Sequence, residues 1–214
     1  AAMKQIALSG KKILFVATKK QAKGLVAEAA EALNMPYITE RWPGGLLTNF
    51  ATIRKSIKKM QIIDKMKENG TFDSLSKRER LQIDRQRAKL DLNLGSIVKM
   101  TRMPEAVFII DTNKEHIALA ESNKLGILSF ALNDTNTNPS HVNFPIPGND
   151  DATKSIECIL SIVTKAIAEG LEERNTEQDK KAVEKKEKAK KIAEGLEEKI
   201  AEKDKKSADN VEKA

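Results

Sequence analysis

Three short, mainly apolar segments constrain the fold of this chain more than any other feature. They are Ile13–Ala17 and Ala106–Ile110, which are continuously apolar, and Ile127–Leu132, which Ser129 interrupts. An unbroken apolar run of this length is typical of a strand that is buried on both faces of a parallel sheet. Apolar residues with helical spacing follow the first two segments, as far as Leu33 and Leu125. The chain therefore alternates strand and helix, which predicts an α/β protein.

Two further strand candidates complete the predicted sheet. They are Met35–Ile38 and Phe144–Pro147, and the two prolines of the second indicate a sheet edge. Right-handed crossovers favour a doubly wound, flavodoxin-like sheet with the strand order 2-1-3-4-5. A final helix is expected after Gly148, with Cys158 buried among its apolar residues. This α/β domain is predicted to comprise residues 1–49 and 104–170, and its helical first residues suggest that further sequence precedes them.

Residues 50–103 interrupt the alternation and predict an antiparallel helical hairpin, a coiled-coil arm inserted into the sheet domain. Phe50, Ile53 and Ile57 form one stripe of a first helix, which Gly70 would end. Ser76 and the acid three residues later form a capping box that starts the second helix. Residues 171–214 are rich in both signs of charge and are predicted to be a partly helical or disordered extension.

The arm also carries more positive charge than the whole chain. Residues 51–103 contain 14 basic and 6 acidic residues, a net charge of +8, whereas the chain totals +7. Such an excess favours a polyanion partner such as RNA, although a solvated charged helix face is the simpler alternative. The single cysteine fits a reducing, cytoplasmic location. The chain has no run of 18 apolar residues, so no membrane-spanning helix is expected.

The switch point of the predicted sheet lies where its first and third strands end. Thr18–Lys20 and Asp111–Lys114 would meet there, and helix N-termini attract anions. Thr18 with Gln21, and Thr112 with Glu115, are also spaced as capping boxes. The glycine motifs that let a backbone approach a nucleotide are missing, so no cofactor and no small-molecule substrate are expected. A cofactor-binding or nucleotide-binding enzyme on a flavodoxin-like sheet is the alternative.

Neither histidine has the spacing of a metal ligand or a nearby nucleophile, so the histidines do not predict catalysis. A metal held by His141 together with Asp150 and Asp151 is left open.

The segment that joins the second strand to the arm contains the only tryptophan of the chain. Arg41 could grip a phosphate, and Trp42 could stack on a base or could plug the base of the arm against the domain. The candidate RNA-binding residues are Lys19, Lys20, Arg41, Trp42, Arg54, Lys55, Lys58 and Lys114.

Five stretches together resemble the bacterial ribosomal protein S2 family. The stretches are ILFVATKKQ from Ile13, PYITERWPGGLLTNFATI from Pro36, NLGSI from Asn93, PEAVFIIDTNKEHIA from Pro104 and IPGNDD from Ile146. They cover most of residues 11–170 in the same order as in the family, and their joint occurrence is specific. Pro43 departs from the leucine that many members have.

The resemblance implies a flavodoxin-like fold with a helical-hairpin insertion and a non-catalytic role in translation. It implies that the protein binds small-subunit ribosomal RNA near the junction of the head and the body. It further implies neighbouring ribosomal proteins as partners, including protein S1, which the chain would help to dock. Family members usually carry an N-terminal hairpin and helix upstream of the region that this chain matches.

Overall fold

The computed structural model describes residues 1–178, and the first 171 of them form one compact unit. Most of the predicted charged extension, residues 171–214, lies outside the described residues. The elements are α1 (Ala2–Leu8), β1 (Ile13–Val16), α2 (Lys20–Ala32), β2 (Tyr37–Ile38), α3 (Phe50–Glu68), η1 (Thr71–Ser74), α4 (Lys77–Leu94), η2 (Gly95–Ile97), β3 (Ala106–Ile110), α5 (His116–Leu125), β4 (Leu128–Asn133), η3 (Pro139–His141) and β5 (Phe144–Pro147). A last helix begins at residue 153 and continues to the end of the described residues.

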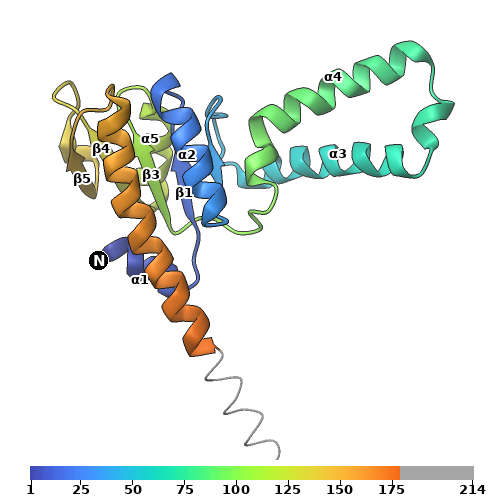
Figure 1. Cartoon of the computed structure of the whole chain (residues 1–214). Helices are drawn as coiled ribbons and strands as arrows, with labels where there is room; N and C mark the ends of the chain where they lie inside the picture. Colours follow the sequence, from blue (N-terminus) through green and yellow to red (C-terminus); the bar gives the residue numbers. More distant parts are fainter. Residues whose placement is uncertain (179–214) are drawn as a thin grey trace, which may run out of the picture. The chain divides into compact units, whose positions relative to one another are not determined.

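The five strands form one parallel sheet in the order β2-β1-β3-β4-β5, which confirms the predicted flavodoxin-like topology (Figure 1). Phe15 in β1 lies opposite Phe108 in β3, which lies opposite Phe130 in β4. The rings of Phe15 and Phe108 are 5.5 Å apart between centroids. This row of aromatic side chains crosses the middle of the sheet, where burial is complete or nearly so.

Helices cover both faces of the sheet because alternate strand residues point in opposite directions. On one face, Phe15 and Phe108 pack with residues of α1, α2 and the last helix. On the other face, Val16 and Ile109 pack with α5 and with the base of the arm. The buried residues on this face form a second core, and the base of the arm is part of it.

The two prolines of β5 protect the free edge of the sheet. Pro145 and Pro147 alternate with Phe144 and Ile146, and Gly148 N–H donates to the Asn133 carbonyl of β4 at 3.1 Å. Phe144 and Ile146 alternate in phase with Gly148, so their backbone groups also face β4. Pro145 and Pro147 face the free edge of the sheet, where they have no N–H group to present. The edge position that the prolines predicted is confirmed.

The arm is the predicted pair of helices, α3 and α4, joined by η1 (Figure 1). Gly70 has a left-handed φ of 70°, and Ser76 with Glu79 forms the predicted reciprocal capping box. Ile57 of α3 and Leu94 of α4 are buried in the second core, which anchors the base of both helices. The second helix, α4, ends at Leu94, and Ile97 belongs to η2.

The expectation that Cys158 is buried was wrong. Ile156 and Leu160 turn toward the first core, whereas the thiol of Cys158 is exposed. Residues two apart on a helix point about 200° apart around its axis, so neighbours in sequence do not share a face. Among the described helices, none is both long and apolar enough to cross a membrane.

Candidate nucleic-acid interface

The side chain of Glu115 fills the switch point between the ends of β1 and β3. Its Oε1 accepts hydrogen bonds from the Thr18 N–H, at 3.1 Å, and from the Thr18 hydroxyl. The hydroxyl of Thr112 donates to Asn133 Oδ1 at 3.1 Å. The predicted capping boxes at Thr18 and Thr112 were therefore wrong, because tertiary partners take both threonines. The Thr18 N–H group, which was expected to attract an anion, thus donates to the Glu115 carboxylate of the same chain.

Lys19 is directed into a group of aspartates. Its Nζ lies 2.6 Å from Asp151 Oδ1, 2.9 Å from Asp150 Oδ1 and 3.5 Å from Asp111 Oδ2. Burial alone would lower the pKa of Lys19, but hydrogen bonds to Asp151 and Asp150 and the nearby negative charges raise the pKa above its usual range. The ammonium group is thus charged and committed within the chain, and it contributes little free positive charge to the surface.

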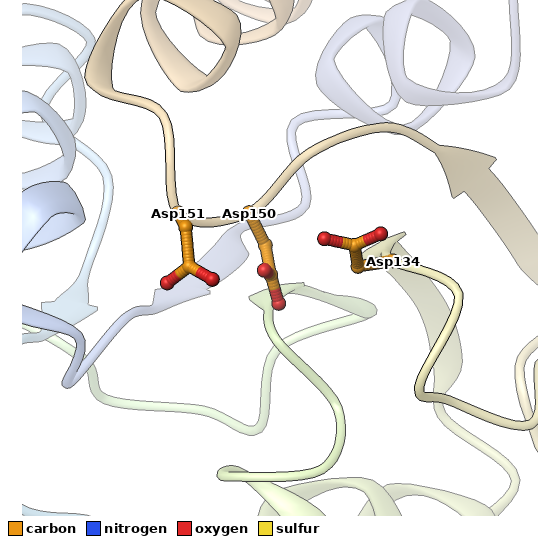
Figure 2. A group of neighbouring side chains, drawn as sticks. All are labelled: Asp134, Asp150 and Asp151. Carbon is orange, nitrogen blue, oxygen red and sulfur yellow. The ribbon is translucent and has the colours of Figure 1, made fainter.

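Two of these aspartates, Asp150 and Asp151, form a compact cluster with Asp134 at the carboxyl ends of β4 and β5 (Figure 2). One oxygen each of Asp134, Asp150 and Asp151 lies within 4.8 Å of the other two. Asp150 is buried, and its Oδ2 has no hydrogen-bond partner among the described residues. Carboxylates in this arrangement could hold a hard divalent cation beside Lys19. His141, considered as a ligand with Asp150 and Asp151, is not part of this cluster.

A hollow of about 220 Å³ next to the filled switch point is lined by two exposed cations, Arg41 and Lys114, and by the acids Glu40 and Glu115, with Trp42 beside them. Lys114 Nζ donates to the Thr18 carbonyl at 3.3 Å. Lys20 is exposed at the start of α2. The structure thus brings Arg41, Trp42 and Lys114 together at one hollow.

Trp42 is held inside the protein by Glu121 of α5. The indole N–H donates to Glu121 Oε1 at 3.1 Å, and the Gly45 N–H donates to the same oxygen at 2.7 Å. Glu121 Oε2 accepts from the N–H groups of Leu47 and Thr48 and from the Thr48 hydroxyl. Burial alone would raise the pKa of this carboxyl, but the hydrogen bonds lower it. Trp42 therefore packs at the base of the arm, which is the alternative to base stacking.

The cations of the arm differ in what they bind. Arg54 donates to the Met100 carbonyl at 3.0 Å, across the base of the arm. Arg87 bonds to Asp64 of the facing helix at 2.8 Å and to Asp91. These two guanidinium groups tie the arm together.

A second set of arm cations faces outward. Lys55, Lys58 and Lys59 are exposed on one side of α3, at spacings of three and four residues. Within the described part of the chain, none of the three has an acidic partner. Lys59 was not among the predicted residues, although its helical spacing from Lys55 could have identified it.

Glu121 is the residue of this region that the sequence did not reveal. It follows no motif, and its partners lie more than 70 positions earlier in the chain. Its only signal in the sequence is that it is the single acidic residue within α5.

These features define a class: a flavodoxin-like protein with an inserted basic hairpin and a switch point filled by its own side chains. The family model for ribosomal protein S2 matches residues 1–170, and the chain belongs to that family. The family consists of structural ribosomal proteins rather than enzymes, which argues against the cofactor-binding enzyme considered from the sequence.

Three curated relatives illustrate the similarity, and each is named small ribosomal subunit protein uS2. The relative from Flavobacterium johnsoniae is 62% identical, and the alignment covers 86% of this chain and 72% of the relative. The relative from Phocaeicola vulgatus is 65% identical, with 83% and 63% covered, and that from Bacteroides thetaiotaomicron is 63% identical, with 83% and 64% covered. The chain thus spans less than two thirds of the length of the latter two.

Proposed function

We propose that this chain is a structural component of the small ribosomal subunit and binds small-subunit ribosomal RNA. The contacts proposed are the exposed face of α3 formed by Lys55, Lys58 and Lys59, and the cations Lys20, Arg41 and Lys114 near the switch point. Lys19, Arg54 and Trp42, which the sequence also suggested, are omitted because Lys19 is paired with aspartates, Arg54 is half-buried against the Met100 carbonyl and Trp42 is buried. Lys114 is kept because it is exposed, although its Nζ donates to the Thr18 carbonyl at 3.3 Å.

The observation that carries the proposal is the separation of two kinds of cation on one arm. Arg54 and Arg87 serve the internal structure of the arm, whereas Lys55, Lys58 and Lys59 are exposed together without acidic partners among the described residues. Like charges gathered on one helix face repel one another and destabilise the helix slightly. A phosphate backbone would neutralise them and release counterions, which gives affinity without reading sequence.

The salt dependence of RNA binding tests this proposal. If each of the three lysines neutralises one phosphate, the variant K55Q/K58Q/K59Q should lower the slope of log K against log salt by about 2–3 units. Glutamine keeps the helix propensity of lysine, so circular dichroism should show an unchanged helix content. The control is K154Q/K165Q on the last helix, where both lysines are exposed. An unchanged slope in an intact arm variant would remove α3 from the interface.

Docking of protein S1, which the family resemblance implies, stays a prediction. Co-sedimentation of the purified chain with purified S1 would test it independently of RNA.

A further inference from the structure

A polar hollow of about 350 Å³ lies between the first turns of α5 and the loop that leads from β4 to β5. Both histidines of the chain, His116 and His141, line it. Every other lining residue is a threonine, an asparagine, a leucine or an alanine, so no lysine, arginine or carboxylate is among them. The hollow therefore offers hydrogen-bonding groups that are mostly amides and hydroxyls.

The loop that forms one wall is held in place by its own hydrogen bonds. Asn123 Nδ2 of α5 donates to the His141 carbonyl at 2.8 Å, which ties the loop to the helix. The Thr137 hydroxyl donates to the Asp134 carbonyl at 2.7 Å, and Asn138 Oδ1 accepts from the Ser140 N–H at 3.0 Å. A ligand would thus meet a wall that is already formed, and binding would cost little ordering of the loop.

Other groups of the hollow are left available to a ligand. The imidazole of His141 and the amide of Asn136 are exposed, and neither bonds to any other described residue. Leu119 is buried and, with Ala120, provides an apolar surface beside them. An apolar surface edged by a few uncharged donors and acceptors suits a planar, neutral ligand. Amide side chains pair with the edges of nucleobases, and RNA is read chiefly through its unpaired bases.

The neighbouring residues suit the backbone of the same ligand. Lys114 and Lys124 directly follow the lining residues Asn113 and Asn123, and both lysines are exposed. Lys114 also lines the hollow that contains Arg41, where one N–H of its ammonium donates to the Thr18 carbonyl at 3.3 Å and leaves the others for a phosphate. We propose that the hollow between α5 and the β4–β5 loop binds one unpaired base of RNA while these lysines contact the adjoining phosphates. This inference rests on the proposed RNA binding and adds a site for a base to it.

The experiment compares RNA hairpins that differ only by one bulged nucleotide. Four bulged hairpins, carrying A, C, G or U, and one fully paired hairpin are titrated with the full chain at one salt concentration, and fluorescence anisotropy gives Kd. The wild type should bind at least one bulged hairpin about tenfold tighter than the paired one, as expected for one or two base hydrogen bonds. The variant N136A/H141A should lose this ratio and keep its affinity for the paired hairpin.

Gln5→Ala, on the exposed surface of α1 at the opposite end of the sheet, is the control and should keep the ratio. Thermal melting checks that the double variant stays folded, as expected because both side chains are exposed. A ratio of one in the wild type, or a ratio that survives in N136A/H141A, would overturn the base site while leaving backbone binding intact. Failure to bind any hairpin would reject both RNA binding and the base site.

Discussion

Glu121 accepts a hydrogen bond from the indole nitrogen of Trp42, 79 positions earlier in the chain, at 3.1 Å. The same carboxylate gathers the backbone of the segment that leads into α3, because it also accepts from the N–H groups of Gly45, Leu47 and Thr48. One buried side chain of α5 thus fixes both the tryptophan and the start of the arm.

Replacing Glu121 by glutamine should destabilise the protein although the side chain keeps its shape. The amide has one acceptor oxygen and presents N–H groups to donors, so at least one buried N–H loses its partner. We expect the free energy of unfolding to fall by about 3 kcal/mol. The measurement is urea denaturation followed by circular dichroism and by the fluorescence of Trp42, the only tryptophan. Glu157→Gln, at an exposed position, should change the midpoint little. Equal midpoints for the two variants would mean that Glu121 does not hold the segment.

The sheet could be predicted from the sequence because its signals are local. The apolar runs around Phe15 and Phe108 identified buried strands, and the prolines of β5 identified an edge. Ser76 likewise caps its helix with a residue three positions away. The topology then followed from general rules of handedness.

Contacts over long sequence distances could not be predicted in the same way. Thr18 and Glu115 were each expected to form a capping box, but 97 positions apart they bind one another. Lys19 was expected to contact RNA, and three aspartates from two distant loops surround it instead. In each case the side chain binds a partner that is distant in the sequence instead of the partner that the local sequence suggested. Only the folded structure shows which of the two partners it binds.

Two glycines in helices should respond oppositely to alanine. A Cβ on Gly170 would lie 2.5 Å from the Lys4 carbonyl oxygen and 3.0 Å from the Ala7 Cβ, so α1 and the last helix would have to move apart. A Cβ on Gly24 in α2 would meet nothing within 4 Å. Gly170→Ala should cost about 1–3 kcal/mol, whereas Gly24→Ala should stabilise by about 0.5–1 kcal/mol through helix propensity. Thermal melting of both variants measures the signs. A stable Gly170→Ala variant would show that α1 does not pack closely there.

Tyr37 offers a test of the electrostatics beside β2. Its hydroxyl donates to Glu31 of α2. This hydrogen bond, together with burial and the negative charge of Glu31, raises the pKa of Tyr37 from 10.0 to about 12. The folded state holds the phenol proton more tightly than the unfolded state does. The resulting stability is fully present below pH 10 and is lost as the pH rises from 10 toward 12.

Because Tyr37 is the only tyrosine, the ultraviolet absorbance of its phenolate reports this single group. Glu31→Gln keeps an acceptor but removes the charge, so the midpoint should move from about 12 back toward 10. Glu28→Gln, nearly one turn earlier on the same helix and also exposed, should leave the midpoint in place. Circular dichroism at each pH separates titration of the folded state from alkaline unfolding. If wild type and Glu31→Gln titrate together while both remain folded, then Glu31 does not control the phenol, and the contact between α2 and β2 is looser than the structure shows.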